Sequence, residues 1–273
     1  MEIACCTGDI WLVDTLASQT QTYWTGQVNL EQMLWTAFKN DQHVIFDRLT
    51  QPPFSMSRCK NVTAYLRHVV QYNRAALLDR MTQPPFSVGH ADVRIPIPDV
   101  WRGGVLTPLE LACKWDSALV LDRLTEEPFS ISAEEARECD CVILQSVCQT
   151  GNTVILNRLG EAPFNFNGAD VRVNENRMLR HAAEHGFVAI LDVLAAAPFL
   201  LNRDDARACN GSALKIAAEN GHVAILDRLA CAPYWLTAFD ARSGDNIALR
   251  LAAQNGHIGV IERLAQWPYL LNQ

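Results

Sequence analysis

The sequence has little positive charge and no long apolar run. Its 23 Lys and Arg residues are outnumbered by 30 Asp and Glu residues, which gives the 273-residue chain a formal net charge of −7. No run of basic residues is suited to track a phosphate backbone, so we expect no nucleic-acid partner. No stretch approaches the roughly 18 uninterrupted apolar residues of a membrane span, and the first residues lack the positive segment of a signal peptide. We therefore expect a soluble protein with no membrane partner.

The sequence also lacks a disulfide framework. Its nine cysteines are odd in number and irregularly placed, which is typical of reduced, small, buried residues. This use of cysteine predicts a reducing compartment, most simply the cytoplasm. Cys139, Cys141 and Cys148 lie close together in the sequence, but their spacing matches no standard zinc motif. We expect no metal and no cofactor.

No local signature of catalysis is present. The chain contains no G-x-G-x-x-G, P-loop or G-x-S-x-G sequence. His181 and His185 are one turn apart on an expected helix, yet no Glu-x-x-His partner or third ligand joins them. The sequence therefore predicts that the protein is not an enzyme. The alternative is an enzyme, or the regulatory domain of an enzyme, with a site in the irregular N-terminal repeats, because a dyad of distant Cys and His side chains leaves no local motif.

What the chain does contain is a recurring phrase that ends in proline and an aromatic residue. Its copies begin at residues 47, 79, 122, 157, 192, 227 and 262, and the last five are 35 residues apart. A second phrase lies upstream of each copy and is seen best in Leu214 to His222 and Leu249 to His257. A period in this range is typical of stacked supersecondary units, and a further copy in residues 1–9 brings the expected number to about eight.

The upstream phrase predicts a short helix that ends in a left-handed turn. Leu249, Ala252, Ala253 and Gly256 occupy one face of a 3.6-residue period. The position that closes the helix holds glycine or one of the other residue types that tolerate a left-handed backbone, Asp and Asn. In chain order these residues are Gly8, Asp41, Asn73, Asp116, Gly151, Gly186, Gly221 and Gly256. Every copy can therefore form the αL turn that ends a helix.

A second helix follows this turn at once. Ile258, Ile261 and Leu264 form its apolar face, and it should end near Pro268, because the residue before a proline is pushed out of the α region. The aromatic residue after each proline is expected to pack between neighbouring units. Recurring dipeptides such as Asp227-Arg228 are expected to form a ladder of charges along the second helices.

Two short motifs resemble those of ankyrin repeats. Thr107 to Ala112 resembles the T-P-L-H-x-A signature, and Ala218 to His222 and Ala253 to His257 resemble the A-x-x-G-H turn. The likeness covers nearly the whole chain and is strongest from residue 177 to residue 269. The proline-ended variant is most similar to ankyrin-repeat effectors of intracellular bacteria. A 35-residue step and a Pro-aromatic pair replace the usual Gly-Ala-Asp turn, which puts the β-hairpin fingers of the family in doubt.

Together, the period and the resemblance imply an all-α, ankyrin-like helix-turn-helix repeat solenoid that spans residues 1–273 as a single domain. Residues 1–29 form an atypical first repeat. Residues 236–273 form the last repeat, whose apolar Val260, Ile261 and Leu264 lack a polar cap, so we expect either self-association through this end or a longer chain. Residues 87–106 form an extended inter-repeat loop, which is either part of the binding face or a neutral insertion.

The resemblance also implies a function and a set of contact residues. Ankyrin partners are proteins that usually dock on the concave face and touch the two residues before the turn of each first helix. The chain is thus expected to be a protein–protein interaction scaffold, either an effector translocated into a host cytosol or a modulator of an effector. With the aromatic residues nearby included, the expected partner-binding residues are Trp35, Lys39, Asn40, Gln71, Tyr72, Trp101, Lys114, Trp115, Thr150 and His185.

The aromatic members of this set concentrate in the first half of the chain. Trp35, Tyr72 and Trp115 fall at the same or neighbouring positions of successive units and would form one exposed apolar patch. The alternative is that these rings fill gaps left by irregular early repeats, since aromatic side chains belong more often to the core than to a site.

Overall fold

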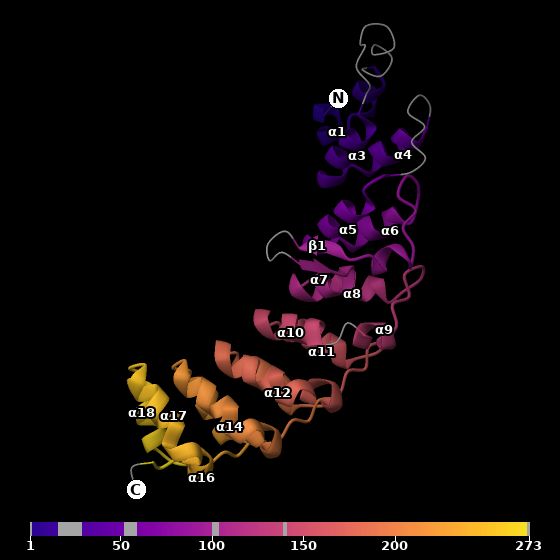
Figure 1. The fold of residues 1–273 in the computed structure, drawn as a ribbon. Coiled ribbons are helices and arrows are strands. Elements are labelled where there is room, and N and C mark those ends of the chain that lie inside the picture. Colours follow the sequence, from indigo (N-terminus) through magenta and orange to yellow (C-terminus); the bar gives the residue numbers. More distant parts are fainter. Residues whose placement is uncertain (1, 16–28, 52–58, 100–103, 139–140, 272–273) are drawn as a thin grey trace. The chain divides into compact units, whose positions relative to one another are not determined.

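The chain is mostly helical in a computed structural model that describes residues 2–15, 29–51, 59–99, 104–138 and 141–271 (Figure 1). This confirms the all-α class, with one two-stranded sheet among the described residues as the exception. None of the described helices combines the length and the apolar character that crossing a bilayer requires. Contacts divide the chain into an N-terminal unit, residues 1–131, and a C-terminal unit, residues 132–273.

The N-terminal unit is built from pairs of short antiparallel helices. Its helices are α1 (Glu2–Thr7), α3 (Leu30–Lys39), α4 (His43–Thr50), α5 (Val62–Gln71), α6 (Ala75–Met81), α7 (Pro108–Lys114) and α8 (Ala118–Leu124). We call α3 and α4, α5 and α6, and α7 and α8 helix pairs, each with a first and a second helix. The first helices pack against one another in chain order, α1 on α3, α3 on α5 and α5 on α7.

The extended segment between α6 and α7 has structure of its own. It contains a 3-10 helix, η1 (Asp92–Arg94), and two strands, β1 (Ile97–Asp99) and β2 (Gly104–Leu106). The strands are antiparallel, with Ile97 opposite Leu106. Pro96 and Pro98 remove backbone donors, so the sequence alone gives only a weak signal for a strand here. β1 packs against α5 and so brings this segment beside a first helix.

The C-terminal unit repeats the pairing more regularly. Its helices are α9 (Ala133–Glu138), α10 (Cys141–Thr150), α11 (Thr153–Gly160), α12 (Gly168–His185), α13 (Val188–Ala195), α14 (Arg203–Glu219), α15 (Val223–Ala230), α16 (Ala238–Ala241), α17 (Ser243–Gln254) and α18 (Ile258–Ala265). Within this unit α10, α12, α14 and α17 lie side by side in chain order, and the second helices α11, α13, α15 and α18 form a neighbouring row (Figure 1).

A left-handed turn closes the first helix at every position where the sequence predicts one. The φ angles at these residues run from 51° at Asn73 to 81° at Gly221. At Gly221 a side chain would also meet the next pair, because an added Cβ would lie 2.8 Å from Nδ1 of His257. The same Cβ at Gly256 would meet open space. Glycine is thus required at Gly221 for its backbone and for its small size, and at Gly256 for its backbone alone.

Hydrogen bonds from each of the last two helix pairs reach back to the pair before it. Nε2 of His257 donates to the Glu219 carbonyl at 2.9 Å, and the hydroxyl of Tyr269 donates to the Leu226 carbonyl at 2.7 Å. The equivalent bonds one pair earlier are His222 to Glu184 and Tyr234 to Leu191. The aromatic residue after the proline is buried in each described copy, as predicted, and Phe54 lies outside the described residues.

The predicted ladder of Asp–Arg charges is present, but its bonds join successive pairs. Five arginines of second helices each donate to the aspartate at the matching position of the preceding repeat. The bonds are Arg48 to Asp14, Arg80 to Asp47, Arg123 to Asp79, Arg228 to Asp192 and Arg263 to Asp227. Because the carboxylates are largely exposed, each bond contributes only about 0.2 to 1 kcal/mol.

In each of the last three helix pairs, the segment that precedes the first helix is itself helical. Each begins with a residue whose side chain caps a helical turn, in a capping box with an aspartate three residues later. The boxes are Asn167 with Asp170, Asn202 with Asp205, and Thr237 with Asp240. A turn of three residues with positive φ, such as Cys209, Asn210 and Gly211, then redirects the chain into the first helix.

All three capping carboxylates also accept a hydrogen bond from an arginine of the preceding segment, and the longest of these bonds runs from Arg137 Nε to Asp170 at 3.1 Å. Arg172 Nε donates to Asp205 at 2.7 Å, and Arg207 Nε donates to Asp240 at 2.6 Å. The Asp240 side chain is only 4% exposed. Burial works to raise the pKa of Asp240, but the bonds from Arg207 and from the Thr237 backbone N–H hold it below its ordinary value. The ionised carboxylate therefore stabilises the folded chain.

The apolar side chains expected to drive self-association through the last helix pair are partly covered. Val260 and Leu264 of α18 are fully buried, whereas Ile261 and Leu271 are partly exposed. Ile258 on the same helix is 68% exposed. Self-association through this pair stays a prediction, and its contact surface would centre on Ile258 and Ile261.

We predict that Gly221→Ala destabilises the protein more than Gly256→Ala. Alanine in the left-handed region costs about 1 to 2 kcal/mol at either position, and at position 221 the collision with His257 adds about 1 to 3 kcal/mol. Urea denaturation of the full chain measures both. Equal losses of stability in the two variants would contradict the prediction, because they would show that His257 moves aside from the new methyl group without lowering stability.

We predict that Asp240→Asn lowers the free energy of unfolding at pH 7 by about 1 to 2 kcal/mol. The folded pKa of Asp240 is depressed, so its contribution is complete above the unfolded pKa of about 3.9 and is lost as the pH falls through the folded value. The gap between the wild type and the variant should therefore close below about pH 4 in urea denaturation. Asp204→Asn, at an exposed neighbour, is the control, and an equal effect there would contradict the assignment.

Candidate functional site

A groove in the N-terminal unit brings together four of the expected partner-binding residues. It is lined by α3, α5 and β1 and holds about 1010 Å³, part of which is open to solvent. Trp35 and Lys39 come from α3, and Gln71 and Tyr72 come from the end of α5. The other lining residues are Asn61, Thr63, Ala64, Arg67, His68, Ile97 and Pro98. We call this site the aromatic groove.

Helix α5 supplies most of the groove because its two faces differ. Ala64, Arg67, His68 and Gln71 share one face at helical spacing and line the groove. The opposite face is buried and consists of Tyr65, Leu66, Val69 and Val70. Arg67 and His68 were not among the expected residues. They lie one turn before Gln71 and Tyr72, so the helical period was the signal that identifies them.

The extended segment forms part of the groove wall. Ile97 and Pro98 of β1, which packs against α5, line it. Ile97 is buried and Pro98 is exposed. The segment that breaks the 35-residue step therefore contributes directly to the groove.

The aromatic rings of the groove are partly core and partly surface. Trp35 is half-buried and meets the rings of Tyr65 and His68 edge-on, at centroid distances of 5.0 and 5.6 Å. Tyr72 lies 4.7 Å from the His68 ring and remains 58% exposed. Trp35 is thus held in place by the core, and Tyr72 offers most of its ring to solvent.

A cation lies over each of the three aromatic residues that the sequence singled out. The pairs are Lys39 over Trp35 at 5.5 Å, Arg67 over Trp115 at 5.9 Å and Arg74 over Tyr72 at 5.9 Å. Such contacts contribute about 0.5 to 1 kcal/mol at exposed sites. Because Arg67 lines the groove and covers Trp115, the same surface continues to the end of α7.

His68 forms part of the groove floor as a neutral ring. Its Nδ1 is buried and has no hydrogen-bond partner within the described part of the chain. Burial lowers the pKa of His68, and the charges of Arg74 and Lys39 lower it further. The imidazole therefore stays unprotonated at neutral pH and packs as an aromatic ring.

The remaining expected residues lie apart from the groove lining. Asn40 is exposed, and its amide donates to the Thr36 carbonyl at 2.8 Å. Lys114 ends α7 beside Trp115. Thr150 and His185 belong to the C-terminal unit, and Trp101 lies outside the described residues. The groove thus brings together four of the ten expected residues, all of them in the N-terminal unit.

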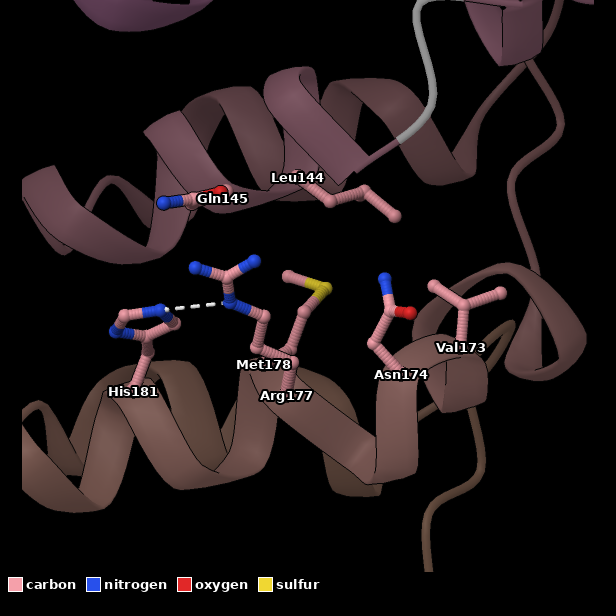
Figure 2. A pocket seen from close by; sticks show the side chains of 7 residues that line it. All are labelled: Leu144, Gln145, Val173, Asn174, Arg177, Met178 and His181. Atoms are coloured by element: carbon pink, nitrogen blue, oxygen red, sulfur yellow. Dashed lines mark hydrogen bonds between the residues drawn. The ribbon is translucent and has the colours of Figure 1, made fainter.

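A smaller hollow lies in the C-terminal unit between α10 and α12. Figure 2 shows the side chains that line it, which are Leu144, Gln145, Val173, Asn174, Arg177, Met178 and His181. Arg177 Nε donates to Nε2 of His181 at 3.1 Å, so the ring hydrogen is on Nδ1, 3.3 Å from the Glu184 carboxylate. Burial lowers the pKa of His181, which agrees with a neutral ring. Nε2 of His181 already accepts from a neighbour in the same helix, and we favour the larger aromatic groove as the site.

The cysteines give no support to a catalytic thiol. Burial raises the pKa of Cys59 to about 11 and that of Cys148 to about 12, so neither is a thiolate at neutral pH. The described cysteines form no disulfide with one another, and the described residues contain no group of three His, Cys, Asp or Glu side chains placed to hold a metal. Cys139 and the side chain of Cys141 lie outside the described part.

Comparison with known proteins gives no independent guide to the site. No protein-family model matches the chain, and a search of curated proteins found no significant match. The case for a function therefore rests on the geometry of the aromatic groove.

We predict that the stability of the protein falls as the pH drops from 7.5 to 5.5 and that His68→Phe reduces this fall. Because the folded pKa of His68 is lowered, the unfolded chain binds the proton more readily. Its contribution to stability is therefore complete above the unfolded pKa of about 6.5 and is lost as the pH falls. Urea denaturation across this range measures the slope. Leu66→Ala, a packing control, should lower stability equally at each pH, and an unchanged slope in His68→Phe would contradict the prediction.

Proposed function

We propose that this chain is a helical-repeat protein of the ankyrin type that binds a partner protein in the aromatic groove. The recurring helix pairs, the left-handed turn at the end of each first helix and the bonds from each pair to the one before support the repeat architecture. The groove supports the binding function because two successive first helices, α3 and α5, line it together.

The proposal rests on one observation, which is that aromatic side chains lie exposed at the edge of the groove. Tyr72 is 58% exposed at the groove edge, and Trp115 lies beyond it under Arg67. Clusters of tyrosine, tryptophan and arginine supply most of the binding energy in protein interfaces. Trp35 lies next to them in the groove and is held in place by ring contacts with Tyr65 and His68, which limits the entropy lost on binding.

We expect Tyr72→Ala and Trp115→Ala each to weaken partner binding by ~2 kcal/mol, or about 30-fold in Kd, without unfolding the protein. Each truncation removes ring surface and the contact between that ring and the arginine over it. Proteins captured from lysates on the immobilised wild type are the candidate partners, and titration calorimetry with each purified candidate then gives its affinity for the wild type and for both variants.

Trp267→Ala is the matched control, because it removes an indole that is 71% exposed in the C-terminal unit. The control should capture the partner as the wild type does. Partner affinity that is unchanged in Tyr72→Ala and Trp115→Ala, with both variants folded by circular dichroism, would exclude the groove as the docking site.

A further inference from the structure

The aromatic groove is positively charged in a chain that is negative overall. The chain carries a formal net charge of −7, yet the described lining residues include Lys39 and Arg67 and no Asp or Glu. Arg74 adds a third cation beside Tyr72. With a screening length of about 8 Å at physiological salt, these nearby charges outweigh distant ones for any group that enters the groove.

The cations of the groove are held by rings and not by carboxylates. Within the described part of the chain, neither Lys39 nor Arg67 forms an ion pair, whereas the arginines of the second helices donate to aspartates. An arginine stacked on an aromatic face keeps the N–H groups at its edge available for a carboxylate. The groove therefore offers donors with no acceptor of their own, next to exposed ring surface.

We propose that the partner enters the aromatic groove with an acidic segment that carries a large apolar side chain. This inference rests on the proposed function and specifies the chemistry of the partner. Carboxylates of the segment bind Lys39 and Arg67 at the groove edge, and its apolar side chain packs on Trp35 and Tyr72. The charges give selectivity and speed of association, and the rings give most of the affinity.

A nucleic acid fits the same surface less well. Single strands also use aromatic rings and cations, but a strand continues past the groove and meets a chain whose net charge is −7. The groove offers three cations close together, and tight binding to a phosphate backbone uses a longer track of them. A short acidic protein segment needs only a local match.

The test uses the full chain and four fluorescein-labelled probes. Three are synthetic peptides of about twelve residues: one rich in Glu with a central Phe, the same peptide with Ser in place of Phe, and a counterpart with Lys in place of Glu. The fourth is a single-stranded oligonucleotide with the same number of negative charges as the first peptide. Fluorescence anisotropy measures binding at low and high salt, because exposed charge pairs weaken as ionic strength rises.

We expect the Glu/Phe peptide to bind best, and we expect the loss of Phe or an increase of salt to weaken it about tenfold or more. Lys39→Glu with Arg67→Glu should weaken it by at least as much. Lys215→Glu with Arg250→Glu, which changes the net charge equally in the C-terminal unit, should stay within about twofold of wild type. Binding of none of the peptides, or equal binding of the Lys peptide, would overturn the inference, and tighter binding of the oligonucleotide would replace it with a nucleic-acid site.

A captured partner separates this inference from the proposed function. If the partner depends on Tyr72 and Trp115 but binds the Lys39→Glu, Arg67→Glu variant as tightly as the wild type, protein binding in the groove stands and the acidic segment is refuted. If the partner is indifferent to Tyr72 and Trp115, the proposed function itself fails. Folding of each variant is checked by circular dichroism, so a lost signal is assigned to binding only where the variant is folded.

Discussion

The left-handed turn at the end of each first helix is the backbone constraint on which the rest of the fold depends. After α14 ends at Glu219, the chain reverses direction at Gly221, whose φ is 81°, so the second helix begins at Val223 and packs back on the first. Few residue types adopt this conformation without strain. The chain meets the requirement with glycine in the regular pairs and with Asp or Asn in three others. Without this reversal, the apolar faces of the two helices would point apart.

Stability is then shared between neighbouring helix pairs. The histidine that follows the turn, the tyrosine that follows the proline and the arginine of the second helix all bond to the preceding pair, as His257, Tyr269 and Arg263 do. Asp240 adds a link of another kind, because one carboxylate caps a helical turn and also accepts from Arg207. Each helix pair is therefore completed by its neighbour, which places the interior of each unit between pairs instead of within any one of them.

The aromatic groove arises where this regularity is broken. In the C-terminal unit, the residue before the turn is polar, as Asn220 and Asn255 are, and the segment before the first helix is a capped helical turn. In the N-terminal unit, Tyr72 and Trp115 take the polar position, and a longer segment places β1 beside α5. Arg67 and Arg74 lie over these rings, whereas the arginines of the second helices bind carboxylates. The longer segment before α7 and the aromatic residues before two of the turns thus produce one charged, aromatic surface.

Local backbone requirements could be predicted from the sequence alone. The turn residues, the two helices of each pair and the burial of residues such as Phe199 follow from periodicity and from what glycine, asparagine and proline permit. The capping boxes were also present in the sequence, as Asn or Thr followed three residues later by Asp, and most of the left-handed residues after them are Asn, Asp or Gly, the types that tolerate this backbone. The groove depended on packing. Trp35, Tyr72 and Pro98 are far apart in the sequence, and only the contact of β1 with α5 and the cations held over the rings decide that they share a surface. Backbone preferences act over a few residues and can be read locally, whereas a surface is formed by side chains from separate segments, whose positions are set only when those segments pack together.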